Sequence, residues 1–101
     1  MSDIQWPSKT ELLVLQMLIT GGESYGLALV KSSDGKLKRG TVYVTLGRME
    51  EKGFVESREE ESTPDYVGIP RRLYKVTGLG ERAARAVEHG VAMMTGRLVT
   101  S

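Results

Sequence analysis

Cysteine is absent from this sequence of 101 residues, and so are long hydrophobic runs. Without cysteine there is no disulfide framework and no thiolate metal site. No apolar stretch approaches the roughly 20 residues that a membrane-spanning helix needs. Residues 1–6 show no basic region leading into an apolar segment. We therefore expect a cytoplasmic protein without membrane contacts.

Groups for catalysis or metal binding are equally scarce. His89 is the single histidine, and no acidic cluster at metal-binding spacing surrounds it. We find no glycine-rich phosphate loop and no nucleophile motif. We predict no metal, no cofactor and no enzymatic activity.

The composition that remains, 40% hydrophobic and 27% charged residues, is typical of one folded domain. The net charge of +1 conceals an uneven distribution. Residues 31–48 carry five basic residues against one acidic residue, whereas residues 50–65 carry seven acidic residues against two basic ones. Arg71, Arg72 and Lys75 then form a second basic cluster.

Two helices are predicted in the first third of the chain. Ser8 and Glu11 fit a capping box, and a helical apolar stripe follows until residues 21–22, where two glycines end it. Ser24 is expected to cap a second, shorter helix, which ends near the turn-forming residues 33–35.

A third helix is predicted from Thr41 to about residue 52, after a brief extended bridge at residues 36–40. Val42, Leu46 and Met49 share one side of this helix and should enter the core. The outward side is expected to carry Thr41, Val44, Thr45, Arg48 and Lys52.

Alternating apolar and polar residues predict strands at 54–59 and 72–76, joined by a long loop as a hairpin. Thr77 can cap a last helix, from about residue 79 to residue 98. The fold class is therefore α+β, mainly α. Three helices, a hairpin and a final helix are the order of a winged helix-turn-helix, whose third helix enters the major groove.

Several segments are similar to the PadR family of transcription regulators over most of the chain, from residue 11 to residue 98. The similar segments are Glu11-Leu12-Leu13-Val14-Leu15, Tyr25-Gly26, Gly40-Thr41-Val42-Tyr43 and the return Gly68-Ile69-Pro70-Arg71-Arg72-Leu73-Tyr74-Lys75-Val76-Thr77. A single terminal helix resembles the family's short subgroup.

This resemblance implies a homodimer that binds operator DNA, usually as a repressor, with an affinity that a small-molecule effector alters in some members. It implies a winged-helix DNA-binding part at residues 1–76 and a dimerisation helix at residues 77–101, within one structural domain. With the basic clusters, it predicts DNA contacts from Lys36, Lys38, Arg39, Thr41, Tyr43, Thr45, Arg48, Arg71 and Arg72. The expected dimer interface comprises Leu79, Ala83, Ala86, Val87, Gly90, Met94 and Leu98.

An alternative hypothesis keeps the fold but makes it a protein-interaction module, with the acidic stretch around Glu59 as the partner surface. Individual residues also have alternatives. Tyr43 can be a packing residue rather than a phosphate contact, and Arg48 can be an ordinary solvated charge. Because side chains alternate along a strand, at most one of Arg71 and Arg72 is expected to reach DNA.

Overall fold

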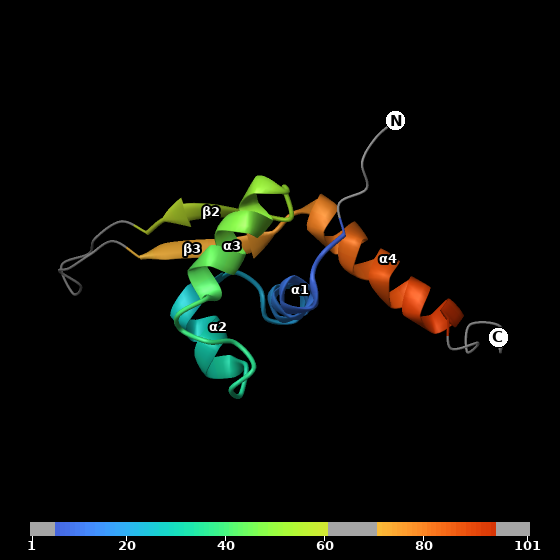
Figure 1. Ribbon diagram of the computed structural model, residues 1–101. Helices are drawn as coiled ribbons and strands as arrows, with labels where there is room; N and C mark the ends of the chain where they lie inside the picture. The colour runs from blue at the N-terminus through green and yellow to red at the C-terminus, as the bar shows by residue number, and fades with distance from the viewer. Residues whose placement is uncertain (1–5, 61–70, 95–101) are drawn as a thin grey trace.

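The computed structural model describes residues 6–60 and 71–94, with no account of the side chains of residues 91–94. Four helices and a small sheet make up this part of the chain (Figure 1). In order they are α1 (Lys9–Gly21), β1 (Ser24–Tyr25), α2 (Gly26–Ser32), α3 (Val42–Glu51), β2 (Val55–Glu59), β3 (Arg72–Val76) and α4 (Gly78–Met94). The predicted α+β class, mainly helical, is confirmed.

The predicted capping box begins α1. The backbone N–H of Glu11 donates to Ser8 Oγ at 3.1 Å, and the N–H of Ser8 donates back to Glu11 Oε1 at 2.9 Å. Glu11 is almost fully buried, and Lys52 Nζ donates to both of its carboxylate oxygens at 2.8 and 3.1 Å. The expectation that Lys52 points away from the fold is wrong, because this buried carboxylate needs a cationic partner.

The start of the second helix differs from the prediction. Ser24 does not cap α2, because it lies in the short strand β1 and its hydroxyl donates to the carbonyl of Tyr25. Tyr25 directly precedes α2 and makes no side-chain cap. Pairing of Ser24 with Tyr74 and of Tyr25 with Leu73 outweighs the local capping preference of serine.

Turns, rather than the expected extended bridge, connect α2 to α3. Asp34 and Gly35 both have positive φ values, 58° and 88°, so the chain reverses directly after α2. Ser33 Oγ accepts from the N–H of Leu37, whose side chain enters the core. The chain therefore keeps one apolar anchor here while its charged neighbours stay in solvent.

The core surrounds the inner side of α3. Val42, Leu46 and Met49 are fully buried, as their spacing predicts, and they pack with Leu15 and Phe54. Thr41 is the residue before α3, but its hydroxyl caps no N–H group of the helix. The opposite side of α3 is left for solvent or for a partner.

The sheet has three strands in the order β1-β3-β2, with both pairs antiparallel. Both predicted strands are present, and the added edge strand β1 is too short for a sequence pattern to reveal it. In the β2–β3 ladder, Val55 pairs with Val76 and Glu59 pairs with Arg72. The backbone N–H of Glu60 donates to the Arg71 carbonyl at 2.7 Å and extends the pairing by one step.

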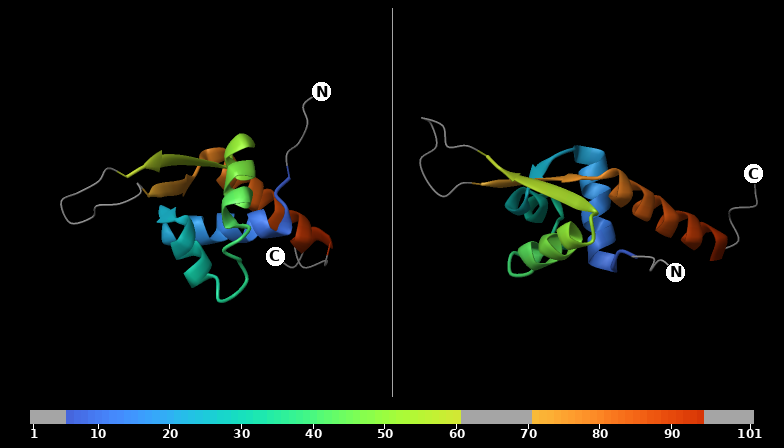
Figure 2. Two further views of the ribbon diagram at one scale, coloured as in Figure 1. Left: turned by 60° about the vertical axis from the view of Figure 1, so that its left-hand side comes forward. Right: turned by 90° about the horizontal axis from the view of Figure 1, so that it is seen from above.

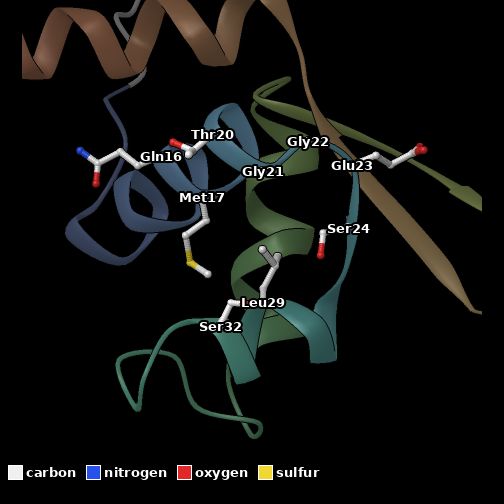
Figure 3. Close-up of a pocket in the computed structure, with 9 residues that line it drawn as sticks. All are labelled: Gln16, Met17, Thr20, Gly21, Gly22, Glu23, Ser24, Leu29 and Ser32. Atoms are coloured by element: carbon white, nitrogen blue, oxygen red, sulfur yellow. The ribbon is translucent and has the colours of Figure 1, made fainter.

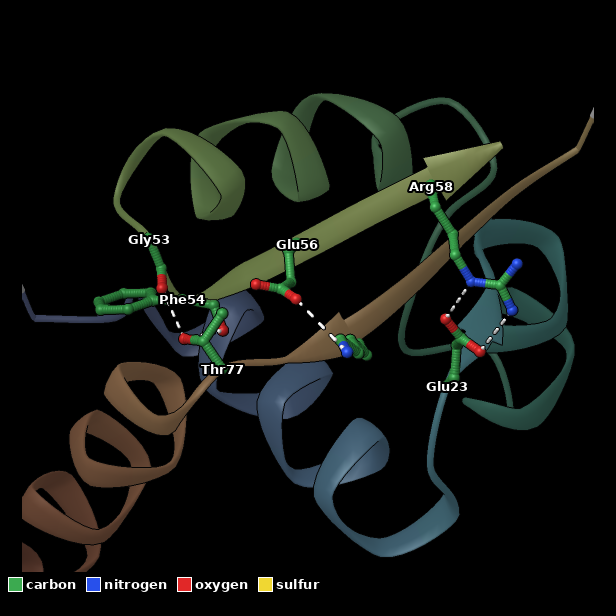
Figure 4. Close-up of polar contacts among 7 residues, drawn as sticks. Glu23, Gly53, Phe54, Glu56, Arg58 and Thr77 are labelled. Atoms are coloured by element: carbon green, nitrogen blue, oxygen red, sulfur yellow. Dashed lines mark hydrogen bonds and ion pairs between the residues drawn. The ribbon is translucent and has the colours of Figure 1, made fainter. Parts of the chain in front are cut away.

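Thr77 joins the start of α4 to the start of β2. Its hydroxyl donates to the Gly53 carbonyl at 2.6 Å (Figure 4). It also accepts from the N–H of Gly80 at 3.0 Å, so the predicted cap is confirmed. From this junction α4 extends away from the far ends of β2 and β3, as two views show (Figure 2). Within residues 6–60 and 71–94, no helix has the length and apolarity needed to cross a membrane.

Gly80 lies at this junction, where there is no room for a side chain. A Cβ at this position would overlap the Phe54 carbonyl oxygen and would come within 3.1 Å of Leu15 Cδ2. Replacing Gly80 with Ala should therefore lower the free energy of unfolding by about 1–3 kcal/mol through overpacking. Urea unfolding at fixed protein concentration, followed by circular dichroism, measures this change.

Gly47→Ala is the matched control, because a Cβ on this exposed glycine of α3 meets nothing within 4 Å. It should leave stability unchanged or raise it by up to about 1 kcal/mol, the usual helix preference of alanine over glycine. Equal stability of the two variants would contradict the close contact at Gly80.

Candidate nucleic-acid interface

The outward side of α3 presents a mixed apolar and polar surface. Tyr43 is 50% exposed and Val44 is 56% exposed, and Arg48 and Thr41 are exposed as well. Thr45, also predicted to face outward, is half-buried. Four of these side chains are therefore accessible to a partner that lies along the helix, and Thr45 is only partly so.

Tyr43 lies against the beginning of α2. A Cβ added at Gly26 would come within 2.8 Å of Tyr43 Cε1 and 3.2 Å of its hydroxyl oxygen, so only glycine admits the ring at this place. The ring thus packs on the α2 backbone while half of the side chain remains in solvent. Tyr43 is therefore a packing residue that also leaves half of its surface accessible to a partner.

The basic residues before and within α3 are exposed and unpaired. Lys36, Lys38, Arg39 and Arg48 form no side-chain ion pair or hydrogen bond with any residue in the described ranges. Their positive charge is therefore available to an external anion. Lys31, at the end of α2, has the same status.

A groove of about 1030 Å³ connects two of these residues, Lys31 and Arg39, to the sheet. It lies between α2, the start of α3 and the start of β3 at Arg72. Its lining includes Lys31, Arg39, Arg71 and Arg72, together with the rings of Tyr25, Tyr43 and Tyr74. No carboxylate is among the lining residues, so the groove suits an anion that also presents apolar surface.

The two wing arginines both line this groove, and both have internal partners. Arg71 Nη2 lies 2.8 Å from Glu60 Oε1, and its guanidinium carbon lies 4.5 Å from the centre of the Tyr25 ring. Arg72 donates to Ser57 Oγ at 3.0 Å and lies 3.6 Å from Glu59 Oε2. The partners alternate as on a strand, with Glu60 and Tyr25 beside Arg71 and Ser57 and Glu59 beside Arg72, yet both arginines line the groove.

Tyr25 completes a cluster with Glu60 and Arg71. Its hydroxyl donates to Glu60 Oε2 at 2.7 Å. This hydrogen bond is the main reason that the pKa of Glu60 is lowered from its ordinary value of 4.5, and the positive charge of Arg71 adds to the effect. The same bond, together with partial desolvation, raises the pKa of Tyr25 above 10.0.

The other acidic residues of the sheet are also engaged. Glu23 accepts two hydrogen bonds of 3.1 Å from Arg58, and Glu56 lies 3.4 Å from Lys75 Nζ (Figure 4). Glu56, Glu59 and Glu60 of the acidic stretch are therefore each paired with an arginine or a lysine, whereas Glu50 accepts from Ser57 and Glu51 is exposed. Glu61 and Asp65 lie outside the described residues.

A second hollow, of about 480 Å³, lies between the end of α1 and α2 (Figure 3). Its lining is mainly neutral and includes Gln16, Met17, Thr20 and Ser32, with Glu23 as the charged member. Because it presents no basic side chain, it does not extend the cationic groove.

The predicted dimer residues lie on a distinct side of α4. Ala84 is buried in the core and Glu88 accepts a hydrogen bond from Gln16 of α1, so this side of the helix faces its own chain. At 100° per residue, Leu79, Ala83, Ala86, Val87 and Gly90 are centred about 100° around the helix from Ala84. Leu79 is 44% exposed. Met94 ends α4 without a described side chain, and Leu98 lies outside the described residues.

A family model described as the transcriptional regulator PadR-like family matches residues 14–86. The chain belongs to the PadR-like family. No curated protein sequence matches it. The predicted resemblance is confirmed, and members of this family are regulators of transcription rather than enzymes as a class.

Solved structures of PadR regulators share this fold. One from Eggerthella lenta has 31% identity and a TM-score of 0.66, covering 89% of this chain and 80% of its own. A PadR-like transcription factor from Bacteroides fragilis has 24% identity and a TM-score of 0.74, covering 88% and 85%. PadR of Bacillus subtilis, solved in complex with operator DNA, has 19% identity and a TM-score of 0.65, covering 77% of this chain and 45% of its own. At these last two identities, the likeness concerns the fold.

Sequence reasoning missed three members of the groove and its surroundings in this PadR-like chain. Tyr25 was noted only as part of a motif, Lys31 only as part of a basic stretch, and Glu60 only as part of an acidic one. The change from negative charge at residues 50–65 to positive charge at Arg71 was the available signal for an ion pair, since opposite charges on neighbouring strands tend to pair. The register that brings Glu60 beside Arg71 was not predictable from it.

The hydroxyl of Tyr25 should ionise above pH 10.0, and Glu60→Gln should lower its pKa by removing the negative charge beside it. Titration of labelled tyrosine rings by NMR, with Tyr25→Phe for assignment, measures both values. Glu56→Gln removes the same charge from β2, the strand that ends directly before Glu60, and should leave the pKa of Tyr25 unchanged. An unchanged Tyr25 pKa in Glu60→Gln would contradict the hydrogen bond.

The direction of the Glu60 shift also sets its effect on stability. Because its pKa in the folded chain lies below the ordinary value of 4.5, the ionised carboxylate stabilises the fold at neutral pH. That contribution is lost as the pH falls through the folded-state pKa.

Proposed function

We propose that this PadR-like regulator binds operator DNA as a homodimer and represses transcription, with α3 in the major groove and β2 and β3 as the wing. The observation that carries the proposal is the separation of charge. Acidic residues of the sheet region pair with basic ones, whereas Lys36, Lys38, Arg39 and Arg48 are exposed and unpaired within the described ranges.

Each type of residue has a defined part in this arrangement. Lys36, Lys38 and Arg39 contact phosphates, which gives affinity without sequence preference. Thr41, Tyr43 and Arg48 lie along the exposed side of α3, where hydroxyl and guanidinium groups reach phosphates or base edges. Thr45 is half-buried and contributes less. Arg71 and Arg72 contact the backbone from the wing.

The protein-interaction alternative receives less support. Its proposed surface, the acidic stretch around Glu59, has Glu56, Glu59 and Glu60 each paired with a basic residue. A basic partner that binds this acidic surface would first have to displace those pairs.

DNA binding is tested with a labelled fragment from upstream of the protein's own gene, titrated at two salt concentrations beside an unrelated fragment. Saturable binding that prefers its own fragment and weakens steeply with salt is expected. Arg39→Gln should reduce the slope of log affinity against log salt by about 1, as for one lost phosphate contact.

Arg85→Gln is the matched control, because Arg85 is an exposed arginine of α4 whose partner is Glu81 in the same helix. It should leave both affinity and slope nearly unchanged. Absence of binding to either fragment, or binding that ignores salt, would overturn the proposal. Equal binding to both fragments would remove its sequence specificity.

The homodimer is proposed from α4, whose second apolar side is only partly covered by the described part of the chain, where Ala83 packs against the core. Leu79 and Ala86 are exposed there and Val87 is half-buried. A stripe of this kind is typically covered by a second copy in a symmetric assembly.

Val87→Glu should convert the protein to monomers by placing a charge in this interface. Light scattering after gel filtration at micromolar concentration measures the mass. Arg85→Glu, a charge change on another side of the same helix, should leave the mass unchanged. A wild-type monomer would contradict the proposal.

A further inference from the structure

The side-chain cluster at the base of the wing resembles an occupied anion site. Arg71 lines the cationic groove, and the Glu60 carboxylate accepts from its guanidinium at 2.8 Å. A carboxylate and a phosphate present similar acceptor oxygens to a guanidinium group. Glu60 thus occupies the place on Arg71 that a DNA phosphate would take.

Resting on the proposed DNA binding, we propose that Tyr25 and Glu60 are positioning residues for Arg71. Tyr25 holds the Arg71 guanidinium over its ring. Glu60 pairs with this guanidinium until a DNA phosphate replaces the Glu60 carboxylate.

The backbone and the ring both fix the place of Arg71. The N–H of Glu60 donates to the Arg71 carbonyl at 2.7 Å, and the Tyr25 ring lies 4.5 Å from the guanidinium. Because Tyr25 itself is paired with Leu73 in the sheet, this ring is anchored to the strand that follows Arg71. The arginine is thus held at the groove before DNA arrives.

Replacing Glu60 by a DNA phosphate on Arg71 costs little free energy. The side chains of Arg71 and Glu60 are 45% and 33% exposed, and an ion pair of this exposure contributes at most about 1 kcal/mol. After exchange, Glu60 keeps the hydrogen bond from the Tyr25 hydroxyl on its second oxygen. Neither the carboxylate nor the guanidinium is left without a polar partner.

The ion pair of Lys52 with Glu11 differs from that of Arg71 with Glu60, because it cannot exchange its carboxylate for a phosphate. Glu11 is 4% exposed in its side chain and also serves the capping box of α1. Separating this pair would leave a buried charge, which is costly. Lys52 is therefore structural, while Arg71 is exchangeable.

Glu60→Gln tests the exchange on the full chain, with the fragment and salt series used for DNA binding. The variant should bind about two- to five-fold more tightly at low salt, the equivalent of losing an exposed competing ion pair. The gain should shrink as salt rises, because screening weakens the pair in the wild type. Glu56→Gln, which removes the same charge from β2, the strand that ends directly before Glu60, should give a smaller gain.

A second background separates competition from simple repulsion. In Arg71→Gln, adding Glu60→Gln should give no more gain than Glu56→Gln does. A gain that persists without Arg71 would show that Glu60 only repels DNA and would overturn the competitor role. So would a Glu60→Gln variant that binds no better than the wild type.

The role of Tyr25 is tested by comparing phenylalanine with leucine at this position. Tyr25→Phe keeps the ring and should bind DNA within about two-fold of the wild type, whereas Tyr25→Leu should lose about two- to five-fold, as for an exposed cation–π contact. Thermal melting of both variants checks the fold. Equal affinities would overturn the ring's role, and wild-type protein that binds no DNA would overturn the proposed function itself.

Discussion

The hydrogen bonds of Thr77 are the constraint on which the arrangement of the molecule depends. One hydroxyl group links the turn after α3, through the Gly53 carbonyl, to the N–H of Gly80 in the first turn of α4. The backbone N–H of Thr77 donates to the Phe54 carbonyl, and Gly80 allows α4 to pass directly over that carbonyl. The end of α3, the start of β2 and the start of α4 therefore meet at one corner, and none of them can be reoriented without disturbing the other two.

The predictability of this fold follows the range of the interactions. Capping by Ser8 and Glu11, the buried side of α3 and the cap at Thr77 depend on residues close in sequence, and all were predicted correctly. Strand β1 and the Lys52–Glu11 pair depend on partners far away in the chain. Nothing in a local pattern specifies that Ser24 meets Tyr74, so a serine in a capping context was assigned to the wrong role.

The candidate site divides along the same line. The exposed cations and the outward residues of α3 could be predicted, because helical spacing separates the buried Val42, Leu46 and Met49 from their neighbours. The pairing of each arginine with its carboxylate could not be predicted, because it depends on the register of the strands. Only the register shows that the acidic stretch neutralises the wing instead of forming a separate surface, and that Tyr25 lies beneath Arg71.

The pairing of charges has a consequence for discrimination between DNA sequences. Unpaired lysines bind any phosphate, so they strengthen specific and nonspecific binding alike. An arginine that already has a carboxylate gains from a phosphate only when that phosphate lies in favourable geometry, because the exchange is otherwise neutral. Under the proposed exchange, Arg71 contributes mainly when α3 lies correctly in the major groove and the DNA backbone passes the groove of the protein. In a chain of net charge +1, such pairing limits nonspecific attraction while keeping an arginine ready for the correct complex.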